Sequence, residues 1–223
     1  MLNSLTRMFA AAPIAALLAC SSASAANPAV AVPEPAADAL ALKTGSQTAV
    51  FAGGCFWGVD AVFKHVKGVT KVVSGYAGGA ASTARYEEVG SGSTGHAESV
   101  EVTYDPTVVS YGTLLKVFFI VAHDPTELNR QGPDSGPQYR STVFFANDAQ
   151  RTAAAAYIAE LTKAGAFRRP IVTTLEPLKG FFAAEDYHQN YLALHPNQPY
   201  IVINDMPKLT VLKQKMPELF VGS

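Results

Sequence analysis

The chain has 223 residues, of which 48% are hydrophobic and 16% are charged, so it can bury the core of one globular domain. Its 17 Lys and Arg residues are balanced by 18 Asp and Glu residues, for a formal net charge of -1. This balance argues against nucleic acid as a partner, because a protein that binds a polyanion normally carries a basic excess.

The first 26 residues are typical of an export signal. One basic side chain, Arg7, precedes the apolar run MFAAAPIAALLA (8–19), which is too short for a permanent membrane span. Two cleavage sites compete: residues 17–20 resemble a lipoprotein box that would make Cys20 the lipidated first residue, and an A-x-A site would be cleaved after Ala25. We expect an exported protein of the bacterial cell envelope or periplasm, with a lipid anchor at Cys20 if the first site is used and in soluble form if the second site is used.

Residues 27–47 are rich in Ala and Pro, with no sustained period and no aromatic residue, which is typical of a linker. The folded domain is predicted to cover residues 48–223. It contains neither an internal repeat nor a second break in composition, so we expect one folded domain. We also expect the chain to be a monomer.

Strands and helices are predicted to alternate along this domain. In chain order we expect strands at 48–54, 69–79, 97–105, 141–147 and 170–176, and helices at 56–67, 110–124, 148–165 and 183–196. Ser110 is a candidate cap for the second helix, and Gly165 ends the third. The first six elements run β-α-β-β-α-β, which favours an α+β fold: a ferredoxin-like two-layer sandwich with a mixed, mostly antiparallel sheet and extra C-terminal helices.

Cys55 lies where the first strand turns into the first helix. The unpaired N–H groups and the dipole of the helix start would favour its thiolate form. Gly53 and Gly54 would leave the sulfur approachable, and Phe56 and Trp57 would wall an apolar pocket. The alternative is a buried structural cysteine, since cysteine is among the most buried residue types.

Glu98 is the second candidate for chemistry. Alternation in the strand at 97–105 places it on the same face as Val100, Val102 and Tyr104. The valines mark the core face, where burial would raise the pKa of the carboxyl group and keep it protonated, able to donate a proton near neutral pH. The pattern equally allows a surface acid at the wet end of the strand.

Five blocks of the sequence match one known pattern. They are GCFWG at 54–58, RYEEV at 85–89, GHAE at 95–98, RQGPDSGPQYRS at 130–141 and AEDYHQNY at 184–191. Together they resemble peptide methionine-S-sulfoxide reductase, the A-type family, over residues 48–205. The resemblance implies thiol-dependent reduction of methionine-S-sulfoxide, protein-bound and free, to methionine, and hence repair of oxidised proteins.

The resemblance also implies roles for single residues. Cys55 would attack the sulfoxide sulfur and become a sulfenic acid, and Glu98 would protonate the leaving oxygen. Tyr86 and Tyr139 match two tyrosines that hydrogen-bond that oxygen. Asp134 matches an aspartate that assists proton and water handling; without the resemblance it reads as a turn residue, and the tyrosines as half-buried structural side chains.

The same resemblance also implies which residues form the substrate pocket. Phe56 and Trp57 match aromatic residues that hold the methyl group of the substrate and select one sulfur epimer. His188 is expected to line this pocket or to be a structural histidine, rather than a base. No metal site is expected, because His188 and His195 lie seven residues apart and no Cys or carboxylate cluster has ligand spacing. The resemblance implies no cofactor besides an external thiol.

The chain departs from many relatives at its C-terminus. They carry one or two resolving cysteines in a glycine-rich tail, whereas this chain ends KMPELFVGS. Lipidation or cleavage would remove the thiol of Cys20, the only other cysteine. The sulfenic acid on Cys55 is therefore expected to be reduced by an external thiol donor: a thioredoxin-like protein, a glutaredoxin-like protein or a small thiol.

Two other functions fit part of the pattern. A hydrolase or acyltransferase would use Cys55 as nucleophile with a histidine such as His188 as base. A binding module for oxidised methionine or an apolar peptide would need no chemistry at all.

Overall fold

The computed structural model describes Ala26, residues 30–36 and residues 45–222. Both predicted cleavage sites, including Cys20, lie outside the described residues. None of the helices in the described ranges is long and apolar enough to cross a membrane.

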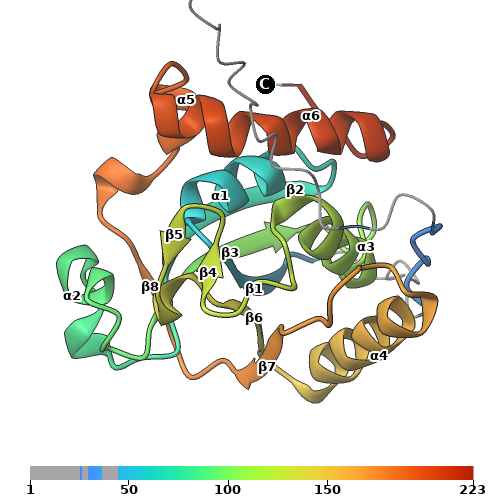
Figure 1. Ribbon diagram of the computed structural model, residues 1–223, viewed down its shortest axis with the longest axis horizontal. Coiled ribbons are helices and arrows are strands. Elements are labelled where there is room, and N and C mark those ends of the chain that lie inside the picture. The colour runs from blue at the N-terminus through green and yellow to red at the C-terminus, as the bar shows by residue number, and fades with distance from the viewer. Residues whose placement is uncertain (1–25, 27–29, 37–44, 223) are drawn as a thin grey trace, which may run out of the picture.

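Within the described residues, six strands form the central sheet, in the order β7-β6-β1-β3-β2-β8 (Figure 1). The strands are β1 (Gln47–Gly53), β2 (Val69–Ala77), β3 (Ala97–Tyr104), β6 (Ser141–Phe145), β7 (Thr174–Pro177) and β8 (Phe181–Ala183). The pairs β1–β3, β1–β6, β2–β3 and β2–β8 are antiparallel, and β6–β7 is parallel. The strands of the β-α-β-β-α-β unit therefore have the fourth-first-third-second order of a ferredoxin-like sheet, which confirms the predicted fold class.

Helices connect these strands, and most of them pack over one face of the sheet. They are α1 (Phe56–Lys64), α2 (Tyr86–Gly90), α3 (Tyr111–Val117), α4 (Asp148–Ala164), α5 (Tyr191–Leu194) and α6 (Met206–Lys215). The Ser110 side chain accepts a hydrogen bond from Thr113 N, which confirms the predicted cap of α3. Gly165 ends α4 with φ 65°, the left-handed conformation that glycine adopts readily.

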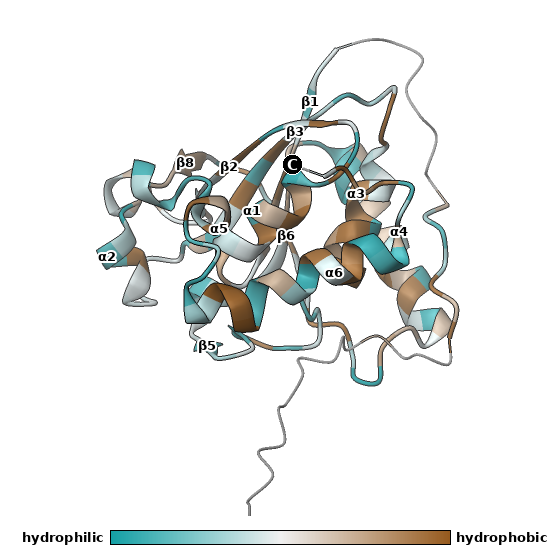
Figure 2. Cartoon of the chain, turned by 90° about the horizontal axis from the view of Figure 1, so that it is seen from above, coloured by the Kyte–Doolittle hydropathy of each residue, from teal (hydrophilic) through white to brown (hydrophobic). Residues whose placement is uncertain are grey.

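The main hydrophobic core lies on the face of the sheet that the helices cover. Phe51 of β1 pairs with Val100 of β3 and Val143 of β6, and all three join the main core beneath the helices. The Phe51 ring stacks on Phe63 of α1, with 5.2 Å between the ring centroids. Figure 2 shows the strands and the helix segments that face them mainly in brown, and the peripheral α2 in teal to white. Glu98 lies on this helix-covered face, as the alternation predicts.

The segment after β7 differs from the prediction. The strand predicted at 170–176 begins only at Thr174, and β8 was not predicted. The helix predicted at 183–196 is wrong: a 3-10 turn (Asp186–His188) is followed by the single turn α5. Asn190, with φ 56°, separates the two turns, and the Gln189 side chain bonds to both the N–H and the C=O of Ser74 in β2. These bonds hold the segment along the edge of the sheet.

The extra C-terminal helices of the prediction are α5 and α6. A π-helical turn (Ile201–Asp205) leads into α6, which packs against α1. The helix α1 itself ends at Lys64, earlier than predicted, because Val66 forms a β-bridge with Phe220 near the C-terminus. The C-terminal segment therefore covers the helix that follows Cys55.

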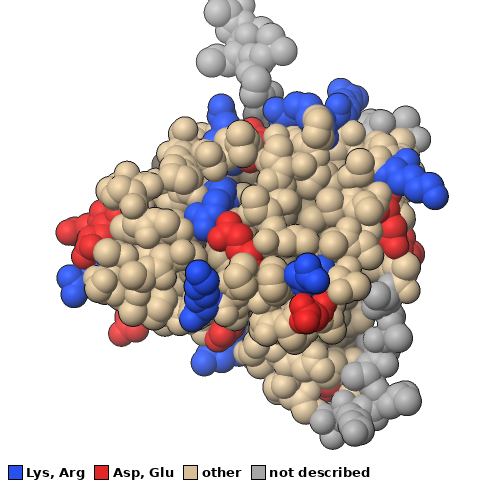
Figure 3. Space-filling view, turned by 90° about the horizontal axis from the view of Figure 1, so that it is seen from below, with Lys and Arg blue, Asp and Glu red and all other residues tan. Residues whose placement is uncertain are grey.

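Residues 30–36, in the predicted linker, lie against α3 and α4. The Tyr157 hydroxyl donates a 3.1 Å hydrogen bond to Pro33 O, and Glu34 pairs with Lys116. On the face drawn in Figure 3, the Lys and Arg side chains of the described residues are interspersed with Asp and Glu and form no continuous basic surface. The absence of nucleic-acid binding remains a prediction.

Candidate functional site

Cys55 is the N-cap residue of α1, as predicted from the strand-to-helix transition, and is 8% exposed. Gly54 before it has φ 88°, and a Cβ atom there would lie 2.5 Å from the Gln131 Cβ. The hairpin of β4 (Arg130–Gln131) and β5 (Asp134–Ser135) therefore packs directly on the turn that carries the thiol. Among the described residues, Cys55 is the free cysteine.

The thiol is more basic than the sequence suggested. Burial raises the pKa of Cys55 well above its ordinary value, and the charges of Glu98 and Asp205 raise it further. The Trp57 N–H and the Lys208 ammonium act in the opposite direction but do not outweigh desolvation. The prediction of a thiolate stabilised by the helix start is wrong for the unliganded site, because loss of water disfavours the charged form more than the helix terminus favours it.

Glu98 is a buried acid beside this thiol. It is 3% exposed on β3, and its Oε2 accepts a 3.1 Å hydrogen bond from the backbone N–H of Phe56, the residue after Cys55. Burial raises its pKa to about 8, with smaller contributions from the charges of Asp134 and Asp205. Since its pKa lies above 7, Glu98 is mainly protonated at neutral pH, as predicted, and can act as a proton donor.

Tyr86 and Tyr139 approach the same two groups from different elements. Tyr86 is the first residue of α2, and Tyr139 ends a 3-10 turn (Pro137–Tyr139). Burial and the charges of Glu98 and Cys55 raise the pKa of Tyr86 to about 12. Burial, then the charge of Glu98, raises the pKa of Tyr139 well above its ordinary value. Both phenols therefore stay protonated at neutral pH and are hydrogen-bond donors next to Glu98 and Cys55.

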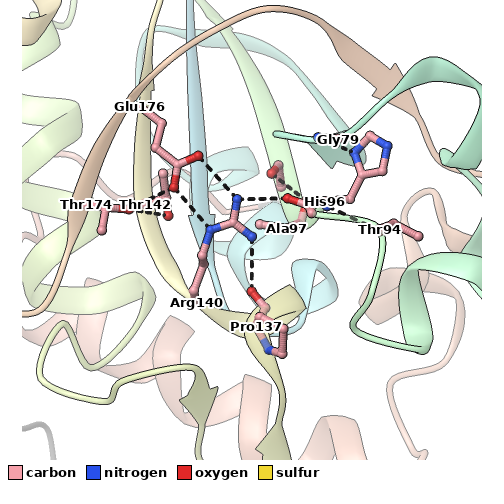
Figure 4. Close-up of polar contacts among 11 residues, drawn as sticks. Gly79, Thr94, His96, Ala97, Pro137, Arg140, Thr142, Thr174 and Glu176 are labelled. Carbon is pink, nitrogen blue, oxygen red and sulfur yellow. Dashed lines mark hydrogen bonds and ion pairs between the residues drawn. The ribbon is translucent and has the colours of Figure 1, made fainter.

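Arg140 holds the turn that presents Tyr139, a function that sequence reasoning missed. Its guanidinium donates to Pro137 O and to Gly95 O, each at 3.1 Å, and forms an ion pair with Glu176 at 3.2 Å. Figure 4 shows Arg140 between Pro137 and Glu176. One side chain thereby joins the Tyr139 turn, the loop entering β3 and the strand β7.

Neighbouring residues fix the Arg140 side chain. Glu176 Oε1 also accepts from Thr174 Oγ1 at 3.1 Å, and the Thr174 hydroxyl lies 2.9 Å from that of Thr142 (Figure 4). A Cβ atom at Gly78 would lie 2.7 Å from Arg140 Nη2, so the guanidinium occupies the space that this glycine leaves. The only feature of the sequence that indicated this role was the position of Arg140 next to Tyr139.

Asp134 lies near the thiol in β5 and has a partner that was not predicted. The Tyr200 hydroxyl donates a short hydrogen bond to Asp134 Oδ2, and burial, followed by the charge of Cys55 and the bond to Asp134, raises the Tyr200 pKa. Burial raises the pKa of Asp134 as well. Nothing local in the sequence links residues 134 and 200, because they meet only when the C-terminal segment folds over α1.

An aromatic cluster forms the wall next to the nucleophile. The Trp57 ring stacks on Tyr191, with 3.7 Å between centroids and 6° between the planes. Its indole N–H donates a 3.1 Å hydrogen bond to His188 Nδ1. Phe56 is 1% exposed and contacts the His188 ring at 5.0 Å between centroids.

His188 is a structural histidine within this cluster. It is 2% exposed and lies 4.3 Å from the Tyr86 ring, measured between centroids. Because Nδ1 accepts the bond from Trp57, the neutral ring carries its proton on Nε2. Burial lowers the His188 pKa. These contacts place His188 within the aromatic cluster, and its role in lining the substrate pocket stays a prediction.

A buried ion pair beneath α1 was also missed. Asp205 is 1% exposed, and its Oδ1 lies 3.1 Å from Lys208 Nζ. A Cβ atom at Gly58 would lie 2.0 Å from Asp205 Oδ1 and 2.6 Å from Lys208 Nζ. The second glycine of GCFWG therefore makes room for this pair. A glycine inside a helical stretch was the available signal, since helix propensity disfavours it.

One further histidine and one cavity of the described residues lie apart from this constellation. The His96 ring forms hydrogen bonds with Gly79 N and Ala80 O. A cavity of about 530 Å³ along the edge of β2 is lined by none of the predicted site residues. Within the described ranges, no group of three or more His, Cys, Asp or Glu residues is placed to hold a metal ion. The absence of metal and cofactor stays a prediction.

The chain was compared with known protein families and curated sequences. The pattern of the family described as peptide methionine sulfoxide reductase matches residues 47–219. A Mesorhizobium japonicum protein described as peptide methionine sulfoxide reductase MsrA 2 is 62% identical over 176 residues, which are 79% of this chain and 90% of the relative. The Synechocystis protein of the same description is 48% identical over 187 residues, covering 82% and 87% of the two chains.

Solved structures give the same result. Reduced Mxr1 from Saccharomyces cerevisiae aligns with a TM-score of 0.63 and 34% identity, covering 73% of this chain and 92% of that chain. Methionine sulfoxide reductase A of Corynebacterium diphtheriae aligns with a TM-score of 0.60 and 37% identity, covering 70% and 78%. The resemblance inferred from the five sequence blocks is thereby confirmed.

Proposed function

Since this chain belongs to the peptide methionine sulfoxide reductase family, whose reaction is thiol-dependent reduction of methionine sulfoxide, we propose that Cys55 is its nucleophile and Glu98 its acid. The observation that best supports this assignment is the hydrogen bond from Phe56 N to Glu98 Oε2. It holds a protonated carboxyl group within one residue of the thiol. Such a pair suits a reaction in which a sulfur is attacked while its oxygen must be protonated.

The first step begins with both groups neutral. Glu98 gives its proton to the sulfoxide oxygen, which makes the sulfur electrophilic, and the Cys55 sulfur attacks it, forming an S–S bond, while the thiol proton passes to the carboxylate. A second proton transfer from Glu98 lets the oxygen leave as water, which breaks the S–O bond. Water then attacks the Cys55 sulfur, the S–S bond breaks, one proton returns to Glu98, and the products are methionine and a sulfenic acid on Cys55. The raised pKa values of both groups support this route, because burial disfavours a resting thiolate and a resting carboxylate alike.

Tyr86 and Tyr139 stabilise the oxygen as charge develops on it. Both phenols are protonated donors that lie near Glu98 and Cys55. Donors placed in advance around such an oxygen stabilise the transition state without reorganisation. Asp134, bonded to the Tyr200 hydroxyl, assists water and proton movement during turnover.

The aromatic wall selects the S epimer. Trp57, held by Tyr191 and His188, binds the methyl group together with Phe56. When the methyl group and the oxygen each have a fixed place, only one arrangement around the sulfur lets Cys55 attack it and leaves the peptide chain pointing to solvent.

An external thiol then restores the enzyme. The sulfenic acid has no partner thiol in the described part of the chain. A thioredoxin-like or glutaredoxin-like protein, or a small thiol, supplies two thiols in turn, so the reaction needs neither a metal nor an organic cofactor. Substrates are proteins, peptides and free methionine that carry the sulfoxide, and the N-terminal signal supports export to the cell envelope.

The assignment is tested by incubating the full chain with the S and R epimers of a methionine sulfoxide peptide and dithiothreitol. We expect reduction of the S epimer alone, and none by the Cys55→Ser variant. Equal reduction of both epimers would contradict the assigned pocket. Activity in the Cys55→Ser variant would remove Cys55 from the mechanism.

A further inference from the structure

Cys55 also lines a cavity on the side of Asp134 and Tyr200. The cavity has a volume of about 120 Å³, several times the roughly 15 Å³ that one water molecule requires. Its lining includes Cys55, Asp134, Tyr200, Asn204, Lys208 and Val211. The described residues assigned to the sulfoxide oxygen and methyl group, Glu98, Tyr86, Tyr139 and Trp57, are not part of that lining.

Building on the proposed function, we propose that this cavity receives the reducing thiol and that Lys208 binds the negative charge of its attacking sulfur. The thiol must reach Cys55, and Cys55 is one of the residues that line the cavity. It therefore offers the donor a path to the sulfenic acid that leaves the aromatic methionine pocket untouched.

Lys208 is the cation of this cavity. Among the described lining residues the other basic side chain is His123, whose pKa burial lowers to about 4, so it is neutral. The Lys208 side chain is only 18% exposed, and Asp205 anchors its ammonium at 3.1 Å. That bond uses one of the three ammonium protons and leaves the others for a ligand.

The charges around Cys55 explain why a cation is needed there. Glu98, Asp134 and Asp205 all act on this site, and each would repel an incoming thiolate when ionised. Lys208 acts in the opposite sense, because its charge lowers the Cys55 pKa. An anionic sulfur that approaches through the cavity would be stabilised by the same charge.

The step balances with thiols alone. The sulfenic acid and one thiol give a mixed disulfide and water: an S–S bond forms, the S–O bond breaks, and the thiol proton leaves with the oxygen. A second thiol attacks the mixed disulfide, which oxidises the donor to a disulfide and returns Cys55 to its thiol.

The two half-reactions can be measured separately. The reduced full chain is mixed with excess methionine-S-sulfoxide without thiol, and the methionine formed per enzyme reports the first half. Dithiothreitol or a thioredoxin is then added, and the rate of sulfenic acid loss reports the second half. If the unchanged chain forms no methionine in the first stage, the proposed function itself fails, which is a different outcome from a failure of this inference.

Lys208→Met should slow sulfenic acid reduction by about tenfold or more with both donors, while the first half changes by less than about twofold. Lys208→Arg should restore most of that rate. Val211→Trp, which fills the cavity without removing charge, should also slow the second half. If Lys208→Met does not fold, Val211→Trp alone tests the proposal. Lys215→Met, on the exposed end of the same helix, is the matched control.

Other outcomes overturn the proposal. A first half slowed as much as the second would make the cavity part of the methionine site. If the variants slowed sulfenic acid reduction by thioredoxin but not by dithiothreitol, the cavity would be a docking site for the donor protein and not the binding site of the attacking thiol. Unchanged rates of sulfenic acid reduction in Lys208→Met and Val211→Trp would exclude the cavity as the path of the donor.

Discussion

Glu98 Oε2 accepts a 3.1 Å hydrogen bond from the backbone N–H of Phe56, so the acid and the turn that carries Cys55 are held by one contact. The bond comes from one of the first N–H groups of α1, which have no partner inside the helix. The strand β3 therefore supplies the acid and the helix start supplies its anchor. Movement of either element would separate the proton donor from the nucleophile.

Glu98→Gln should lower the rate of methionine formation by about 10²-fold or more, because the amide cannot protonate the leaving oxygen. The rate for the unchanged chain should fall as pH rises through about 8, the pKa to which burial raises Glu98. The measurement is single-turnover methionine formation between pH 6 and 9.5. A variant with near-normal turnover, or one that keeps the same alkaline fall, would exclude Glu98 as the acid.

The same substitution should change stability in a pH-dependent way. The folded-state pKa of Glu98 lies above its ordinary value, so the folded chain binds more protons than the unfolded chain between pH 4.5 and about 8. The contribution of Glu98 to stability is thus fully present below pH 4.5 and is lost as pH rises to about 8. In urea titrations, the free energy of unfolding of Glu98→Gln should rise relative to that of the unchanged chain from pH 5 to pH 8. A constant difference would contradict the raised pKa.

Tyr86→Phe and Tyr139→Phe should each reduce kcat by about tenfold or more, since each removes one donor to the developing oxygen charge. The KM for the sulfoxide should change less, because these bonds strengthen in the transition state. Steady-state kinetics with dithiothreitol would measure both constants. Tyr187→Phe, with an exposed ring outside the oxygen site, is the control. A loss confined to KM would mean that the phenols only bind the substrate.

Arg140→Lys should lower kcat through Tyr139, because a lysine cannot bond at once to Pro137, Gly95 and Glu176. A double-mutant cycle tests this role: in the Tyr139→Phe background, Arg140→Lys should cause much less further loss than it does alone. Additive losses would show that Arg140 supports folding or another group instead of positioning Tyr139.

Gly58→Ala should destabilise the fold by about 1–3 kcal/mol, although alanine favours helices, because the added Cβ would lie 2.0 Å from Asp205 Oδ1. Gly90→Ala is the matched control: a Cβ there meets no atom within 4 Å, and its free energy of unfolding should stay within about 0.5 kcal/mol. Urea titration of both variants gives the comparison. Equal stability of the two variants would mean that Asp205 and Lys208 can move away from α1 without lowering the free energy of unfolding.

The sequence by itself determined the order of the first strands and helices and the position of Cys55 at a helix start, and it left Glu98 two places, the core face or the wet end of its strand. These features follow from periods of two and 3.6 residues and from turn residues, which act over a few neighbours in the chain. The structure decided between the two places for Glu98: it lies on the core face, 3% exposed, and burial there raises its pKa to about 8.

Only the tertiary structure decided how the distant parts of the site meet. Asp134 reaches Tyr200, and Gly58 admits Asp205 and Lys208, because the C-terminal segment folds back over α1. The same packing reverses the expected pKa shift of Cys55. A helix terminus can be predicted from local sequence, but the loss of solvent that opposes it depends on every element that covers the thiol.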